Sequence, residues 1–142
     1  MTMQSRRQMI ARAALGLGAL LAGSSAAVAH HSFAMFDFSK TQMLKGTVQE
    51  FRWTNPHVTL LVATTPAGGG PAEIWSMELT SPGNLTRVGW SRHSFKPGDR
   101  IELEFFPLRD GKHGGAFRKA TLLDTGQVLT SNLREAEKPG LK

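Results

Sequence analysis

Hydrophobic and polar residues alternate along five stretches of this chain, and a period of two is typical of strands that bury one face. In the third stretch, Trp75, Met77 and Leu79 share one face, while the residues between them share the other. Asn55-Pro56 ends the first stretch, because proline restricts the backbone of the residue before it. We therefore predict five strands, over 43–53, 57–65, 72–79, 101–106 and 116–123.

Between the third and fourth stretches the period changes to that of a helix. Ser81 is a good N-cap, Pro82 suits the first helical position, and the apolar spacing then continues to about Trp90. Three strands, one short helix and two strands are the order of an OB-fold, a small five-stranded, partly open Greek-key barrel. A β-sandwich is the alternative, but it needs about seven strands.

The first residues have the features of an export signal. Ser5-Arg6-Arg7 and the apolar residues after it fit the twin-arginine signature, although ordinary secretion is the alternative. The apolar stretch is too short to span a bilayer, and Ala27-Val28-Ala29 is an A-x-A cleavage site. We expect a periplasmic protein with no membrane anchor after cleavage. The expected organisation is a signal peptide (1–29), a lead (30–42), an OB-like barrel domain (43–130) and a polar tail (131–142).

Charge and cysteine content narrow the classes of partner. The formal net charge is +6, but three arginines of the signal segment supply half of it, so the mature chain carries +3. A nucleic-acid-binding protein needs a dense basic face, and we therefore expect no nucleic-acid partner. The chain has no cysteine, which excludes disulfides, thiolate metal sites and a lipoprotein anchor.

All five histidines follow the cleavage site, and one of them is created as a ligand by cleavage. A cut after Ala29 makes His30 the first residue, so its free amine and its ring can chelate one metal ion together. A further imidazole completes a three-nitrogen site, a histidine brace, that favours copper. We predict His57 as this partner, with His31 nearby.

Other interpretations of the histidines stay open. A cut after Ala27 would leave Val28-Ala29-His30, a square-planar copper or nickel site. His57 can instead be a strand-start residue bonded to a backbone carbonyl. His113, in a glycine loop, is predicted to be a mobile and poor ligand; with His31 and Met35 it is a reserve. His93 is predicted to lie on the surface.

No motif of a conventional enzyme is present. The sequence has no Gly-x-Ser-x-Gly elbow and no HExxH helix, and no Lys-Ser/Thr pair follows Gly68–Gly70. Glu102 and Glu104 share a strand face, which is typical of a solvated face. The three tryptophans could form a stacking surface for bases, but in a small barrel such residues usually fill the core.

The chain resembles a bacterial family of small exported proteins that is classed as a domain of unknown function. The resemblance covers about residues 30–125 and implies no established activity. The matching segments are His30-His31-Ser32-Phe33-Ala34, Lys45-Gly46-Thr47-Val48, Trp53-Thr54-Asn55-Pro56-His57, Trp75, Glu78, Ser81-Pro82, Leu85, Arg87, Gly89-Trp90 and Lys96-Pro97-Gly98-Asp99.

Three functions are compatible with these features. The first is a periplasmic, non-enzymatic binding module that binds copper through His30, His31 and His57. The second is a metal-free module that offers an open barrel face or the Gly68–Gly70 loop to a protein or envelope partner. The third is a copper redox enzyme.

Export should leave a chain that begins at His30. The intact mass of protein recovered from the periplasm should therefore equal that of residues 30–142. A mass that corresponds to a chain beginning at Val28 would contradict this expectation and would favour the square-planar terminal site.

Overall fold

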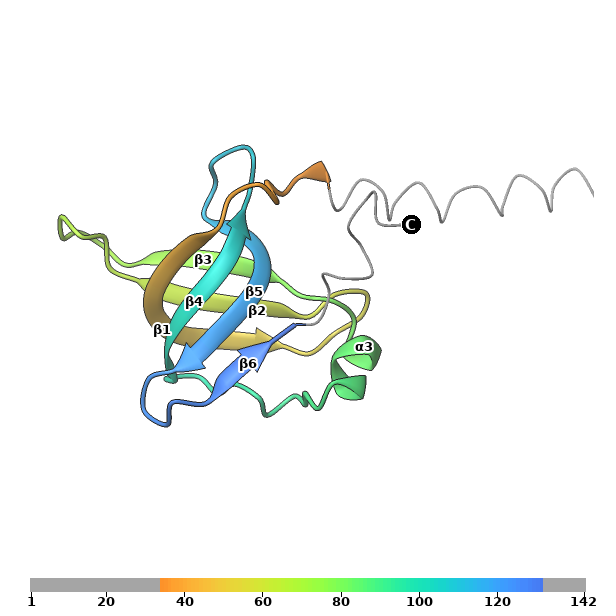
Figure 1. The fold of residues 1–142 in the computed structure, drawn as a ribbon. Helices are drawn as coiled ribbons and strands as arrows, with labels where there is room; N and C mark the ends of the chain where they lie inside the picture. Colours follow the sequence, from red (N-terminus) through yellow and green to blue (C-terminus); the bar gives the residue numbers. More distant parts are fainter. Residues whose placement is uncertain (1–33, 132–142) are drawn as a thin grey trace, which may run out of the picture. The chain divides into compact units, whose positions relative to one another are not determined.

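The computed structural model describes residues 34–131, and these residues form one β-barrel with a single short helix (Figure 1). Its elements are β1 (Gln42–Arg52), β2 (Thr59–Thr64), β3 (Glu73–Glu78), α3 (Pro82–Arg87), β4 (Arg100–Pro107), β5 (Gly114–Leu122) and β6 (Val128–Thr130). Within this part of the chain, no helix is both long and apolar enough to cross a bilayer.

Five strands close into a ring. The sheet order is β3-β2-β1-β4-β5-β6, and β3 also pairs with β5 in parallel. The β3–β5 pairing runs from Ser76↔Gly114 to Glu78↔Ala116 and joins the two sides of the sheet. With its helix between β3 and β4, this is the OB-like order, so the predicted fold class is confirmed.

Two local predictions need correction. The helix ends at Arg87 and not near Trp90, because Gly89 takes a positive φ of 89° and the Trp90 N–H turns back to the carbonyl of Leu85. The strand β6 was missed, because three residues are too few to show a period. It adds to the barrel by pairing with the second half of β5.

The core is built from the inward face of each strand. Met77 and Leu79 are fully buried, whereas Ile74 on the opposite face of β3 is half-exposed, as the alternation predicts. Leu85 of α3 and Trp90 are buried in the same core cluster, and the indole N–H of Trp90 donates to the carbonyl of Thr130 at 3.0 Å. In Figure 1, α3 lies away from the loop that joins β4 to β5.

Two adjacent glycines let β5 approach its neighbouring strands closely, and Gly114 does so where the ring closes. A Cβ on Gly114 would lie 2.7 Å from the carbonyl oxygen of Ser76, and a Cβ on Gly115 would collide with the carbonyl oxygen of Phe106 and the ring of Phe105. Real Cβ atoms do not approach other atoms so closely. The strand β5 can therefore approach β3 at Gly114 and β4 at Gly115 only because both positions lack a side chain.

Gly115→Ala should destabilise the barrel by about 1–3 kcal/mol, the usual cost of overpacking. Gly68→Ala is the matched control, because nothing lies within 4 Å of an added Cβ there and its φ is not positive. Urea denaturation measures both variants. Equal stability of the two variants would contradict the close approach at Gly115.

Candidate functional site

His57 is held at the entrance to β2 by the end of β3. It follows the cis Asn55–Pro56 bond, and the neighbouring Val58 exchanges backbone hydrogen bonds with Leu79 and Thr80. The Nδ1 atom of His57 lies 3.1 Å from the carbonyl oxygen of Leu79 and 3.1 Å from Oε1 of Glu78. Both neighbours are acceptors, so the ring proton belongs on Nδ1.

This arrangement leaves Nε2 as the nitrogen with a free lone pair. The His57 side chain is 39% exposed, so Nε2 is not sealed in the core. Metal-ligating histidines usually donate their second ring N–H to a carbonyl or carboxylate in the same way. The hydrogen bond to a backbone carbonyl that we expect of a purely structural His57 is thus present. The same hydrogen bond is also compatible with a role as a metal ligand.

Of the three predicted metal ligands, the structure describes only His57. His30 and His31 lie outside the described residues. Within residues 34–131, no group of three histidine or carboxylate side chains could hold a metal ion. His93 is exposed, as predicted. Met35, a reserve ligand, is also exposed.

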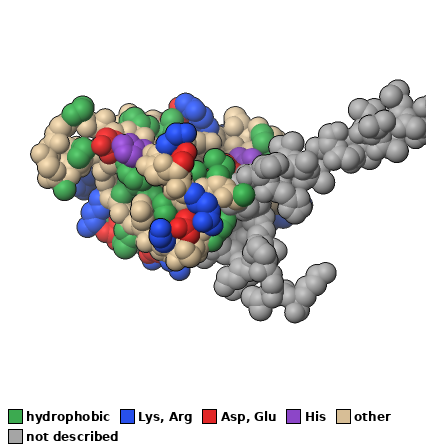
Figure 2. Space-filling view, turned by 90° about the horizontal axis from the view of Figure 1, so that it is seen from above, with side chains coloured by type: hydrophobic (Ala, Val, Ile, Leu, Met, Phe, Trp, Pro, Cys, Tyr) green, Lys and Arg blue, Asp and Glu red, His purple; other side chains and the backbone are tan. Residues whose placement is uncertain are grey.

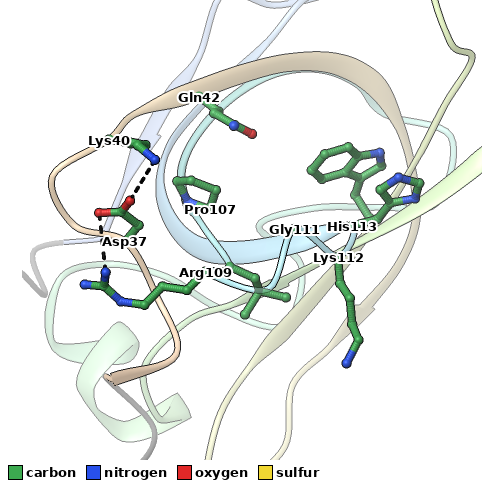
Figure 3. Close-up of a pocket in the computed structure, with 10 residues that line it drawn as sticks. Asp37, Lys40, Gln42, Pro107, Arg109, Gly111, Lys112 and His113 are labelled. Carbon is green, nitrogen blue, oxygen red and sulfur yellow. Dashed lines mark ion pairs between the residues drawn. The ribbon is translucent and has the colours of Figure 1, made fainter.

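A second candidate site lies at the mouth of the barrel, on the side of the β4–β5 loop. The described part of the lead runs along this loop: Phe36 bridges to Leu108, and the Asp37 N–H donates to the Pro107 carbonyl at 2.8 Å. A cavity of about 450 Å³ lies between the lead, the β4–β5 loop and Trp75 of β3. We call it the mouth cavity (Figure 3).

Charged side chains surround this opening. Asp37 lies between Lys40, whose Nζ is 3.2 Å from the carboxylate, and Arg109, whose Nη1 is 4.0 Å away (Figure 3). Lys112 and His113 lie across the opening from them. Viewed from this end, basic, acidic and histidine side chains are interspersed and form no field of a single sign (Figure 2).

The Asp37 carboxylate is stabilised in its charged form. The hydroxyl of Ser39 donates to Oδ1 at 2.6 Å, and together with the ammonium group of Lys40 it lowers the pKa of Asp37 from 3.8 to about 2. Asp37 therefore stays ionised under any physiological condition, and its acceptor capacity is taken up by its own neighbours.

Trp75 forms an aromatic wall of the mouth cavity. Its ring packs edge-on against Phe105, and the imidazole of His113 stacks on it with centroids 4.7 Å apart and planes at 16°. Nε2 of His113 also lies 3.6 Å from Glu73. The stack with Trp75 gives the imidazole of His113 a packed position at this opening, and the mobility expected of this side chain stays a prediction.

The indole N–H of Trp75 is shielded from solvent and has no hydrogen-bond acceptor among the described residues. An unsatisfied buried donor of this kind costs about 1–3 kcal/mol. Alternation along β3 predicted that Trp75 points inward. No sequence pattern indicates that its N–H lacks an acceptor, or that the lead and the β4–β5 loop enclose a cavity beside it.

Comparison with known proteins identifies one family model, described as a family of unknown function (DUF6152), which matches residues 18–118. No curated protein matches the sequence.

Two solved structures of mitochondrial single-stranded DNA binding proteins from S. cerevisiae are similar in fold. The first is 12% identical, with a TM-score of 0.45, and the alignment covers 59% of this chain and 93% of that chain. The second is 10% identical, with a TM-score of 0.44, and covers 65% and 95%. Those proteins bind DNA, unlike the expectation for this chain, but the likeness is too distant to assign a partner.

The carboxylate of Asp37 should titrate near pH 2 in carboxyl-detected NMR. Because this pKa lies below the ordinary 3.8, its contribution to stability is complete above that value and is lost as the pH falls toward 2. Ser39→Ala should move the midpoint up toward 3.8.

Asp110 is the internal control for this titration. The N–H of Lys112 lowers its pKa independently of Ser39, so its midpoint should not change in Ser39→Ala. A wild-type midpoint of Asp37 at the ordinary value would show that the Ser39 hydrogen bond does not form in solution.

Proposed function

This chain belongs to the family of unknown function DUF6152, and we propose that it is an exported, non-enzymatic module that binds copper in the periplasm. His57 is the ligand that the barrel supplies. The amine and the ring of His30, freed by cleavage after Ala29, supply the other nitrogens, and His31 lies next to them in the sequence.

The orientation of His57 is the observation that carries this proposal. With Nδ1 held by Leu79 and Glu78, the lone pair of Nε2 is available for a metal, and the tautomer needs no rearrangement. Imidazole and amine nitrogens suit Cu(II), which prefers tetragonal nitrogen ligation. A pre-oriented ring loses less freedom on binding than a freely rotating one.

The remaining ligands are proposed from chemistry alone. A terminal histidine offers two nitrogens to one ion, so only one further imidazole is needed for a three-nitrogen set. Among the histidines of the described residues, His113 is stacked on Trp75 and His93 is an exposed surface residue. His57 is the one whose ring is fixed by hydrogen bonds through a single nitrogen.

Surface charge supports a ligand other than nucleic acid. Many cations of the described residues lie near acids, as Lys45 does with Glu102 at 3.1 Å and Arg118 with Glu104 at 3.2 Å. Tracking of a phosphate backbone needs unmatched positive charge along a groove. The interspersed charges in Figure 2 do not form such a stripe on the face shown.

Mature protein that begins at His30 should bind one Cu(II) ion, with nitrogen hyperfine structure in its electron paramagnetic resonance spectrum. His57→Gln should weaken copper affinity by at least about tenfold, since loss of a second-shell partner alone costs 10–100-fold. A glycine added before His30 should also weaken it, because it moves the free amine away from the imidazole.

His93→Gln is the matched control and should leave affinity and spectrum unchanged. If the glycine extension and His57→Gln both leave them unchanged, the proposed ligand set is wrong. If copper binding is lost in the glycine extension but kept in His57→Gln, the site lies at the terminus and does not involve the barrel. Mature protein that binds no copper would favour a metal-free interaction module.

A further inference from the structure

We propose that the mouth cavity binds a small organic carboxylate with a planar body. None of the residues that line it is a proposed copper ligand, so this site goes beyond the copper proposal and can be tested on metal-free protein. Three features carry the inference: an excess of donors around the opening, an aromatic wall, and one indole N–H that has no acceptor.

Hydrogen-bond donors outnumber acceptors among the side chains that line the cavity. Lys40, Arg109 and Lys112 are cationic, and Gln42 and Trp75 each carry a neutral N–H donor. The carboxylate of Asp37 is the acidic side chain among them, and Ser39 and Lys40 already occupy it. A complementary ligand must therefore bring acceptors, and a carboxylate brings them with the matching charge.

The cations are able to turn toward a ligand. Lys112 is 78% exposed and lies 3.0 Å from Asp110, outside the cavity lining. An exposed ion pair of this kind contributes little, so exchanging its partner for a bound carboxylate costs little. Lys40 is similarly exposed and contacts Asp37 at the edge of the same opening.

The indole N–H of Trp75 gives the site a specific donor. It is buried without an acceptor, and buried polar groups are nearly always paired in folded proteins. In the absence of ligand it is covered by its neighbours. A ligand reaches this N–H when a neighbouring side chain turns away, and the imidazole of His113, which stacks on the ring, is 46% exposed and free on its outer side to do so.

The planar body follows from the wall of the cavity. The Trp75 ring, Pro107 and Leu108 form an apolar side next to the charged one. A volume of about 450 Å³ lies in the usual range for small-molecule sites. An aromatic or otherwise flat body packs against Pro107 and Leu108, with its carboxylate toward the cations and the N–H edge of the indole.

Benzoate is the probe, and the readout is the indole N–H resonance of each tryptophan in metal-free ¹⁵N-labelled protein. The Trp75 resonance should shift and saturate at millimolar benzoate. The Trp90 resonance should not move, because its N–H is bonded to Thr130. Benzamide, which has the same ring without the charge, and inorganic phosphate, which has charge without the ring, should shift Trp75 only weakly.

Lys112→Gln should weaken benzoate binding about two- to fivefold, the range expected for one exposed charge. Lys45→Gln is the matched control, since Lys45 is equally exposed but pairs with Glu102 away from the cavity. Trp75→Phe, followed through the Gly111 amide, should weaken binding more than about tenfold, because a hydrogen bond to a charged group is lost.

A Trp75 resonance that does not respond to benzoate would overturn the proposal. Equal responses to benzamide would contradict the role of charge, and equal responses to phosphate would contradict the planar body. Lys112→Gln keeps the test decisive even if Trp75→Phe does not fold. Copper binding plays no part in these measurements, so failure here leaves the His57 proposal untouched.

Discussion

The pairing of β5 with β3, which the close approach at Gly114 allows, is the constraint on which the rest of the structure depends. Without this contact the sheet would be an open, twisted sheet with two edges. With it, β3 is paired on both sides, to β2 and to β5, and the ring encloses one core. Over residues 76–78 this pairing leaves β3 no exposed edge and removes its backbone groups from water.

Both candidate sites lie next to the β3–β5 pairing, which we call the seam. Glu78, which orients His57, is paired with Ala116 at one end of it. At the other end the Ser76 N–H donates to the carbonyl of His113, and this bond ties the β4–β5 loop to β3 beside Trp75. The positions of the His57 ring and of the mouth cavity therefore depend on the same backbone contact.

The features that depend on a few neighbouring residues, such as strand faces and helix caps, could be predicted from the sequence. Alternation predicted the inward face of β3, and Ser81 with Pro82 predicted where the helix begins, because period and capping act over a few residues. The end of α3 was predicted too late, and the three-residue β6 was not predicted at all. The hydrogen bond of His57 to a backbone carbonyl was anticipated as one of two alternatives.

The mouth cavity was not predictable, because its parts are far apart in the sequence. It needs the lead at Asp37, the wall at Trp75 and the loop at Lys112 to meet, and only the closed topology brings them together. The same holds for the missing acceptor of the Trp75 N–H, which is a property of the packed structure and of no local pattern.

The central claim is that the seam is a fixed part of the barrel. Native-state hydrogen exchange at the Ser76 amide tests this claim most directly. If the seam is fixed, this amide, bonded to the His113 carbonyl at 3.2 Å, should exchange about as slowly as amides of the β1–β4 ladder. Exchange of Ser76 as fast as that of the Gly68–Gly70 loop would show that β3 and β5 separate readily, and would contradict the account.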